Sequence, residues 1–357
     1  MREPYPPLEP RRSGWLDTGD GHEIWFEDCG ALHGLPVVFL HGGPGSGCKP
    51  LHRQFFDPAR YRIVLLDQRG CGRSRPLGEV RANTTQHLID DLELLRATLG
   101  IERWVVFGGS WGATLGLCYA AAHPVRVLAL VLRGSFLARP SDLDWFFRDG
   151  ASRLFPQAWE RLRSAVTPVE RSELLAALYR RVFGPDPAER NRAVQAWQDW
   201  GGSVALANLP APSEKDLPVE LLAQAGSSMA PGAEPAQPGE RKPEAATVPR
   251  VPVPATEGLA QARLLASTRI ELHYAAARYF VADDPVLARA ARCPRVPTFI
   301  VHGERDFTCT PEAALALHAV LPWAELELLP GTGHLASEPR MTTALIAITD
   351  RLPGLFA

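Results

Sequence analysis

The pattern of hydrophobic positions predicts two kinds of element that alternate along most of the chain. Short apolar runs, each ending near a glycine-containing turn, are typical of buried strands. They cover residues 36–40, 61–66, 103–107, 127–132, 296–302 and 324–329. Helical patterns lie between them, over residues 84–99, where leucines recur at three- and four-residue intervals, and over residues 113–122. This alternation predicts an α/β fold whose largely parallel sheet has helices on both faces.

The alternation stops between residues 139 and 290, where the composition becomes helical and rich in tryptophan and arginine. We interpret this stretch as a helical cap inserted between a first core part (1–138) and a second core part (291–357). Ten of the 33 prolines fall between residues 210 and 254. Such a composition buries too little apolar surface to order itself, so we expect residues 211–255 to form a flexible excursion on the cap.

Charge and composition exclude several functional classes. The chain has 38 Lys and Arg against 40 Asp and Glu, so no basic field attracts nucleic acid or anionic lipid. No run approaches the roughly 18 apolar residues of a membrane span, and residues 1–10 do not resemble a secretory signal. We therefore expect a cytoplasmic protein with no membrane or nucleic-acid partner, and the oligomeric state stays open.

Cysteine and histidine spacing gives no sign of a bound metal. The six cysteines are scattered without Cys-x-x-Cys spacing in a chain large enough to fold without disulfides, so we interpret them as free thiols. No histidine pairing suggests a metal site, and the glycine-rich segments lack the Gly-x-x-x-x-Gly-Lys-Ser/Thr phosphate loop. The sequence predicts neither a metal nor a cofactor.

The first chemical signal is a Gly-x-Ser-x-Gly pattern at residues 108–112, between a predicted strand and a helix of small residues. A tight strand-to-helix turn strains its central residue and lifts the Ser110 hydroxyl clear of the sheet. The N-terminus of the following helix also favours the negative charge that develops there. The pattern alone is weak, but this setting makes Ser110 the candidate nucleophile.

A serine nucleophile needs a base, and the base needs a carboxylate that orients it. Where the serine lies in such an elbow, these groups follow in the order Ser, Asp or Glu, His, on loops after later strands. The loops after the last two predicted strands contain Asp306 and His334, which complete a predicted triad with Ser110. Glu304 is the competing acid, but the shorter Asp306 lies further along the loop and suits a firm hold on an imidazole.

Acyl transfer also needs two N–H donors for the developing oxyanion. The backbone N–H of Trp111, directly after the nucleophile, is one candidate. The sequence His-Gly-Gly-Pro-Gly at residues 41–45 follows an early strand, and its glycines let the backbone approach a substrate. We expect Gly43 to be the second donor, with Gly42 as the alternative, and His41 to shape the loop.

A second patterned turn, at residues 67–74, follows the predicted strand 61–66. Its residues suggest no reaction. We expect Asp67 and Arg69 to fix this loop beneath the site through local hydrogen bonds.

With these residues in place, the sequence resembles the proline iminopeptidases (prolyl aminopeptidases), α/β-hydrolase-fold serine peptidases that release an N-terminal proline. The shared motifs are His-Gly-Gly-Pro-Gly at 41–45, Gly-Gly-Ser-Trp-Gly at 108–112 and Gly-Ala-Ser-Arg-Leu-Phe-Pro at 150–156. The resemblance runs from residue 8 to the C-terminus and leaves out chiefly the proline-rich stretch. It implies the α/β-hydrolase fold, the triad already predicted, no metal, and a helical cap that builds the proline pocket.

The resemblance also implies how the free amino terminus is held. In this family two cap carboxylates are understood to bind it, one in a Trp-x-x-Trp-Glu motif and one in an Arg-Ile-Glu motif. Glu271 preserves the second motif, whereas Gly201 stands in place of the first glutamate. The pocket residue Phe136 is retained, while Phe147 replaces a common tyrosine and Ala275 replaces an aromatic residue. Losing one carboxylate weakens the capture of an ammonium group. The alternative is that Asp199, two residues away, substitutes for it, although on a helix it would face a different direction.

These observations predict a serine aminopeptidase that releases N-terminal proline, or a similar small residue, from a peptide or small amino-acyl substrate. Ser110 attacks the carbonyl, His334 takes and returns the proton, Asp306 orients His334, and Glu271 receives the amine. The alternative keeps the triad in an esterase or amidase with an enlarged pocket. A noncatalytic binding protein is disfavoured by the intact triad and by both oxyanion segments.

Overall fold

The computed structural model describes residues 2–209 and 256–356, so the predicted excursion at 211–255 lies outside the described residues. Within them, eight strands form one sheet in the order β1-β2-β4-β3-β5-β6-β7-β8. The strands are β1 (Arg12–Asp17), β2 (Glu23–Gly30), β3 (Leu35–Leu40), β4 (Tyr61–Leu66), β5 (Trp104–Gly109), β6 (Val127–Arg133), β7 (Thr298–Gly303) and β8 (Glu325–Leu329). Strands β3 to β8 are parallel to their neighbours among themselves, whereas β2 is antiparallel to β1 and β4.

The six predicted strands are all present, but β1 and β2 escaped the prediction. β1 is largely exposed and has no apolar run, and in β2 charged residues occupy buried positions. Glu27 and Asp28 have less than 5% of their surface exposed. Arg53 Nη2 lies 2.8 Å from Glu27 Oε2, and Arg62 Nη2 lies 2.9 Å from Asp28 Oδ2. These ion pairs let acidic side chains occupy the interior, where a search for apolar runs does not find them.

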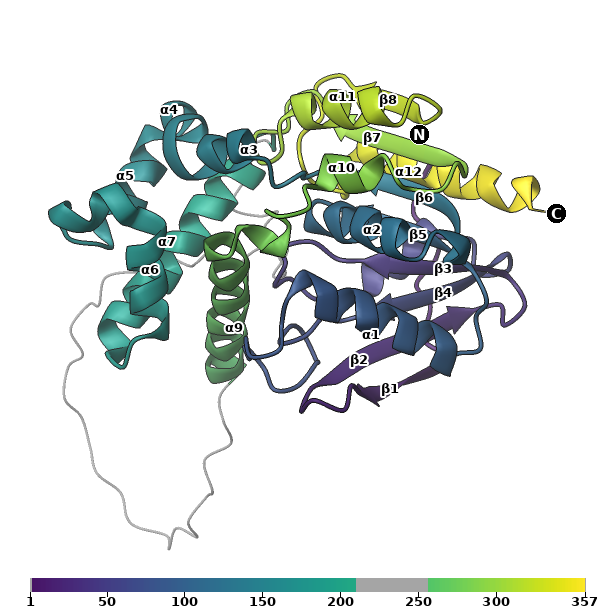
Figure 1. The fold of residues 1–357 in the computed structure, drawn as a ribbon, viewed down its shortest axis with the longest axis horizontal. Helices are drawn as coiled ribbons and strands as arrows, with labels where there is room; N and C mark the ends of the chain where they lie inside the picture. The colour runs from purple at the N-terminus through teal and green to yellow at the C-terminus, as the bar shows by residue number, and fades with distance from the viewer. Residues whose placement is uncertain (1, 210–255, 357) are drawn as a thin grey trace, which may run out of the picture.

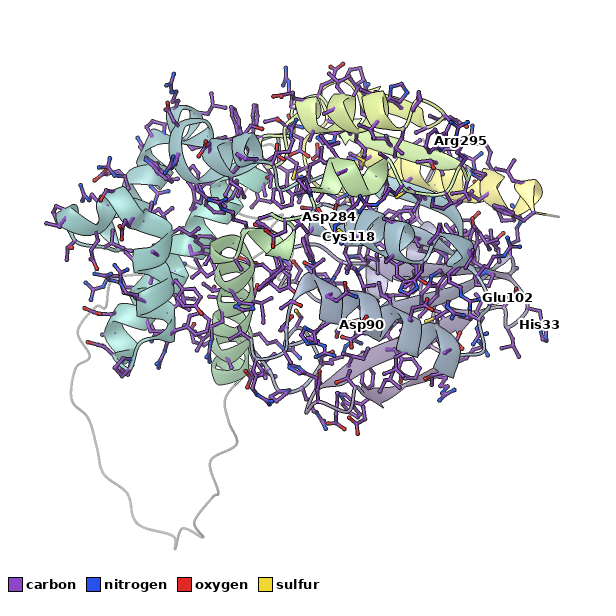
Figure 2. All side chains as sticks on the ribbon, in the orientation of Figure 1. His33, Asp90, Glu102, Cys118, Asp284 and Arg295 are labelled. Atoms are coloured by element: carbon purple, nitrogen blue, oxygen red, sulfur yellow. The ribbon has the colours of Figure 1, made fainter. Side chains whose placement is uncertain are left out.

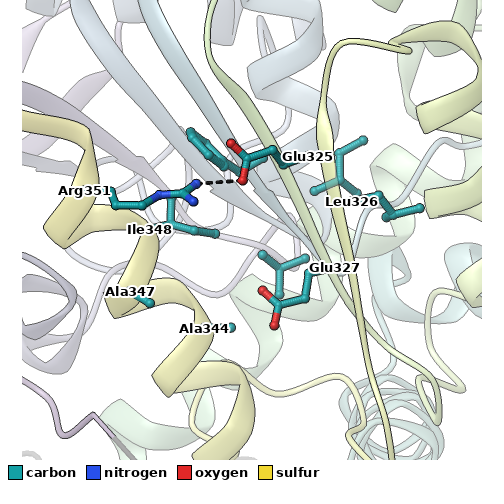
Figure 3. A pocket seen from close by; sticks show the side chains of 10 residues that line it. Glu325, Leu326, Glu327, Ala344, Ala347, Ile348 and Arg351 are labelled. Carbon is teal, nitrogen blue, oxygen red and sulfur yellow. Dashed lines mark hydrogen bonds and ion pairs between the residues drawn. The ribbon is translucent and has the colours of Figure 1, made fainter. Parts of the chain in front are cut away.

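The prediction that the last strand is fully buried is wrong. β8 is at the edge of the sheet, and its Glu325 and Glu327 are exposed. Both side chains line a shallow hollow of about 160 Å³ between the sheet and α12 (Pro339–Arg351), where Glu325 Oε2 lies 2.7 Å from Arg351 Nη2 (Figure 3). α12 covers this face only partly, so the strand alternates between exposed and half-buried positions, and only Leu329 at its end is buried.

Helices cover both faces of the sheet (Figure 1). One face packs against α1 (Thr85–Thr98), α2 (Trp111–Ala122), α10 (Val286–Ala290) and α11 (Pro311–Val320). The other packs against α12 and the short 3₁₀ helix η1 (Pro50–Phe55). The predicted α/β architecture, a mostly parallel sheet with helices on both faces, is confirmed.

The helix predicted over residues 84–99 is α1, and its ends have clear causes. Thr84 is the N-cap and accepts a hydrogen bond from His87 N over 3.5 Å, satisfying one of the free N–H groups at the helix start. Leu88, Leu92 and Leu95 are buried against the sheet. The leucine spacing therefore identified the face of α1 that packs on the core.

Between β6 and β7 the described chain forms helices and no strand. They are α3 (Pro140–Asp144), α4 (Ala151–Leu154), α5 (Pro156–Ser164), α6 (Leu174–Phe183), α7 (Pro187–Ala205) and α9 (Thr256–Ala276), with short turns between them. Apart from α3, these helices share an apolar core of their own, in which Trp200 packs against Trp159 and Phe146. Figure 1 shows them together at one end of the sheet, and α9 contributes Ile270, Tyr274 and Ala275 to the core on the sheet. α10 packs back on α2.

The helical body lies at the carboxyl ends of the parallel strands. His33 and Glu102, which precede β3 and β5, are at the opposite end of the molecule (Figure 2). The loops that follow β3, β5, β7 and β8 therefore open toward the cap helices, which is the side of a parallel sheet where active sites form. No helix in residues 2–209 and 256–356 combines the length and the apolar character needed to cross a bilayer.

Candidate active site

Ser110 occupies the tight turn between β5 and α2, with φ of +56° and ψ of −124°. A residue with a side chain adopts this conformation only under strain, so the surrounding packing must hold it. Ser110 N donates to Arg133 O on β6 over 2.8 Å. Close glycine packing lets the turn form: a Cβ at Gly108 would lie 2.2 Å from Gly112 O, and a Cβ at Gly112 would lie 2.0 Å from Leu40 O.

Asp306 and His334 come together at the ends of β7 and β8. His334 Nδ1 lies 2.7 Å from Asp306 Oδ2, and Asp306 Oδ1 accepts the backbone N–H groups of Thr308 and Cys309, each over 2.9 Å. Burial acts to raise the pKa of Asp306, but the hydrogen bonds that it accepts and the neighbouring imidazoles of His334 and His302 hold the pKa below its usual value. An ionised carboxylate only accepts, so His334 Nδ1 carries the proton and Nε2 can act as a base. Glu304 is exposed.

Ser110, the candidate nucleophile, and His334 are linked through Arg133. Arg133 O accepts from Ser110 N, and Arg133 Nη1 donates to His334 O over 2.7 Å. The Ser110 hydroxyl lies 3.9 Å from Cys309 Sγ and makes no hydrogen bond to the His334 ring. Catalytic hydrogen bonds of this kind are often long or poorly aligned in hydrolases without substrate.

The predicted oxyanion donors lie on either side of the nucleophile. A Cβ at Gly42 would lie 3.2 Å from Ser110 Cβ, so the loop after β3 touches the elbow. Gly43 has φ of +109°, a conformation that suits glycine. Within the part of the chain that the structure describes, neither Gly43 N–H nor Trp111 N–H donates a hydrogen bond, which leaves both for a substrate oxygen.

Gln68, which the sequence reasoning did not single out, connects the two oxyanion segments. Its backbone N–H donates to His41 Nε2 over 3.0 Å, and its side chain donates to His41 O over 2.9 Å and accepts from Trp111 Nε1 over 2.9 Å. His41 Nδ1 must then donate to Gly42 O, 2.9 Å away. Burial lowers the pKa of His41 and keeps it neutral. His41 therefore shapes the loop, as predicted.

The loop after β4 is fixed as predicted. Asp67 accepts from Cys48 N over 2.6 Å and from Arg73 N over 2.9 Å. Arg69 makes two hydrogen bonds of 2.7 Å to the carboxylate of Asp91 on α1. These bonds hold the loop under the oxyanion segment.

The carboxylate of Glu271 on α9 has no cationic side chain as a partner among the described residues. Its oxygens accept from Trp197 Nε1 over 2.6 Å and from Ser267 Oγ over 3.0 Å. Burial raises the pKa of Glu271, although both hydrogen bonds oppose the rise. Among the described residues no Lys, Arg or His lies within 4.0 Å of this carboxylate, in contrast to the paired acids of β2. A half-buried, unpaired acid of this kind suits a cationic ligand.

The position of the missing second glutamate is open. Gly201 lies one turn after Trp197 on α7, so both are on one face of the helix. A Cβ at Gly201 would meet nothing within 4 Å. Asp199, the nearest acid along the helix, is bonded instead to Gln195 Nε2 over 2.8 Å. In this structure Glu271 therefore has no second carboxylate from α7 beside it.

Trp197, which donates to this carboxylate, belongs to one aromatic cluster, and a second aromatic cluster lies beside Trp111 at the elbow. Phe147 stacks on Trp197 with ring centroids 5.6 Å apart. Phe136 packs edge-on against Tyr279 at 4.7 Å, and Tyr279 lies 5.5 Å from Trp111. The sequence analysis did not identify Tyr279 as a residue near the site. Its position depends on a left-handed backbone conformation with φ of +56° at that residue, which the residue pattern does not predict.

Sequence comparison assigns the family. A family model described as the alpha/beta hydrolase fold matches residues 36–340. A proline iminopeptidase of Xylella fastidiosa is 42% identical over 351 residues, which cover 98% of this chain and 99% of the relative. The proline iminopeptidase of Arabidopsis thaliana is 37% identical over 353 residues, which cover 98% of this chain and 82% of the relative. The chain belongs to the proline iminopeptidase family. The resemblance found in the sequence is thereby confirmed.

Solved structures agree with the fold at low sequence identity. A proline iminopeptidase-related protein from Thermus thermophilus has a TM-score of 0.52 at 22% identity, covering 96% of this chain and 98% of that one. VinJ has a TM-score of 0.57 at 23% identity, covering 97% and 100%. The predicted α/β-hydrolase fold is confirmed.

Proposed function

We propose that this protein is a serine aminopeptidase that releases N-terminal proline from peptides, with Ser110, Asp306 and His334 as its triad. Membership of the proline iminopeptidase family supports the activity. The observation that carries the assignment is the cation-free carboxylate of Glu271 on the cap helix that lies next to the core. An aminopeptidase needs such a group, because its substrate carries a free ammonium beside the scissile bond, whereas an esterase does not.

In the proposed acylation step, Ser110 Oγ attacks the prolyl carbonyl carbon while His334 Nε2 takes the hydroxyl proton. The N–H groups of Gly43 and Trp111 stabilise the oxyanion. The carbonyl then re-forms, the C–N bond breaks, and the imidazolium returns the proton to the leaving peptide amine. Water repeats the sequence on the prolyl-Ser110 ester and releases proline. Throughout, Asp306 holds the His334 tautomer.

Recognition of proline is proposed to combine one charged and several aromatic contacts. The substrate ammonium binds Glu271, and the pyrrolidine ring packs against Phe136 and Phe147. Their partners Tyr279 and Trp197 support these rings at 4.7 and 5.6 Å. Such a pocket favours a small, apolar first residue with a free amine.

We further propose that residues 139–290 act as a cap unit over a core made of residues 1–138 and 291–357. The separate apolar core of the cap helices supports this division. We also propose a cytoplasmic location. It is supported by the six cysteines, all free and including Cys118 on α2 (Figure 2), because thiols persist in a reducing compartment.

The test compares proline 4-nitroanilide, N-acetylproline 4-nitroanilide and a short-chain 4-nitrophenyl ester. We expect cleavage of the first anilide and a loss of at least about 100-fold in kcat/KM for the acetylated one, because acetylation removes the charge that Glu271 binds. Rapid hydrolysis of the ester with no cleavage of the free-amine anilide would instead assign the protein to the esterases.

A further inference from the structure

The carboxylate of Glu338, which is outside the triad, binds the main chain of the loop that carries His334. Glu338 precedes α12 and has 6% of its surface exposed. Glu338 Oε2 accepts the backbone N–H of Gly333 over 2.8 Å, and Oε1 accepts that of Leu335 over 3.1 Å. These two N–H groups flank His334 on either side. One rigid carboxylate therefore fixes the direction in which the main chain presents the imidazole.

The same carboxylate receives a hydrogen bond from the cap region. Asn208, just past the end of α7, donates from Nδ2 to Glu338 Oε2 over 2.8 Å and to Gly331 O over 2.9 Å. The two acceptors lie on opposite sides of His334 in the sequence. A single amide group thus joins the end of α7 to both ends of the His334 loop.

The side chains of Asn208 and Glu338 pack tightly against Gly333. A Cβ added at Gly333 would come within 2.7 Å of Asn208 Cβ and 2.9 Å of Glu338 Oε1. On the other side, Arg133 Nη1 donates to His334 O over 2.7 Å. Glu338 and Arg133 therefore fix the main chain around His334, while Asp306 fixes the ring.

We propose that Glu338 and Asn208 are positioning residues for His334, and that through them the end of cap helix α7 is mechanically coupled to the catalytic base. The inference rests on the proposed function only in taking His334 as the base. Neither residue contacts the reacting atoms. Their loss should therefore slow every reaction of Ser110 by a similar factor, whatever the substrate carries at its amine.

The first test replaces Asn208 with alanine and uses Asn191→Ala as the matched control. Asn191 is an exposed asparagine on α7 whose side chain makes no hydrogen bond in the described structure. For Asn208→Ala we expect kcat per titrated active site to fall about 3- to 10-fold, with KM changed less than about twofold. The control should match the wild type in both constants.

The second test uses Glu338→Gln, which keeps the shape but presents an NH₂ group to one of the two backbone donors. We expect a loss in kcat of about 10- to 100-fold, since a buried N–H then lacks its acceptor. If the Glu338→Gln variant folds poorly, the kcat of the Asn208→Ala variant tests the proposal by itself. Active-site titration with a fluorophosphonate corrects all rates for the fraction of folded enzyme.

The decisive readout is substrate independence. The second-order rate of fluorophosphonate labelling, ester hydrolysis and proline anilide hydrolysis should fall by equal factors in both variants. A merely structural role would lower the melting temperature and leave kcat per labelled site at the wild-type value, which would overturn the inference. Failure of the wild type to label at all would reject the proposed serine mechanism instead, so the two failures are distinguishable.

Discussion

Trp197 on α7 donates its indole N–H to the carboxylate of Glu271 on α9 over 2.6 Å, so the two long cap helices meet at the acid proposed to bind the substrate amine. Phe147 stacks on the same indole. The carboxylate is thus oriented before substrate arrives, and its charge is balanced by hydrogen bonds alone. The first three predictions follow from this arrangement.

Glu271→Gln should separate amine recognition from chemistry. The amide keeps the shape of the side chain but loses the charge that attracts an ammonium group. We expect kcat/KM for proline 4-nitroanilide to fall about 10- to 100-fold, the range expected for one charge-assisted contact. Hydrolysis of an ester without an amino group should change less than about threefold. An equal fall in both activities would contradict the assignment of Glu271 to the amine.

The same substitution should stabilise the free enzyme at neutral pH. The pKa of Glu271 is raised by burial in the folded state, so its ionisation opposes folding at pH values above that pKa. Glutamine removes this cost, and we expect a melting temperature higher by on the order of 2 °C at pH 7.5. The difference should shrink as pH falls through the raised pKa and vanish below the ordinary value near 4.5, where both states are protonated. A gap that widens on acidification would refute this account.

Gly201→Glu should strengthen amine binding. The position is on the Trp197 face of α7, and an added Cβ would meet no atom within 4 Å, so the helix accommodates the side chain. A second carboxylate is expected to raise kcat/KM for proline substrates about 10- to 100-fold, reduced by the desolvation of the new charge. Gly201→Gln is the matched control, since it adds the same bulk without charge. Equal effects of the two variants would attribute the change to packing.

Ser110 should be the one residue labelled by a fluorophosphonate, and two substitutions there should differ in stability. Both Ser110→Ala and Ser110→Gly remove the nucleophile, and we expect kcat to fall on the order of 10⁴-fold or more. Alanine keeps the strain at φ of +56°, whereas glycine relieves it. The glycine variant should therefore be the more stable by about 1 kcal/mol in denaturant titrations. Probe attachment at another residue would remove the mechanism.

Much of the core could be predicted because each signal was local. The strands from β3 to β7 are apolar runs with both faces covered, and the order of Ser110, Asp306 and His334 follows from the succession of strands. The two errors lie toward the two edges of the sheet, since β2 is next to the edge strand β1 and β8 is itself an edge strand. In β2 ion pairs place acids in the interior, and in β8 the end of the helix layer leaves Glu325 and Glu327 exposed.

The residues that sequence reasoning missed around the site act across long separations. Gln68 joins His41 to Trp111, and Asn208 meets Glu338 across 130 residues of sequence. Polar residues of these types are common in loops, and only the folded arrangement distinguishes them. The position of Tyr279 depends on a rare backbone conformation. Tertiary contacts of this kind leave no periodic trace in the chain.

The packing of α12 beneath the sheet also sets an order of events during synthesis. Tyr61 Oη on β4 donates to Thr349 O over 2.5 Å, and Thr349 Oγ1 donates to Phe55 O over 2.7 Å. β4 can therefore form these contacts only after a residue 288 positions later has been synthesised. At about 5–20 residues per second, a ribosome needs roughly 15–60 s to cover that distance. During this interval the aromatic surface around Phe55 and Phe107 has no permanent cover. We expect nascent chains arrested before residue 339 to be protease-sensitive and to recruit chaperones, and chains released after residue 352 to become resistant.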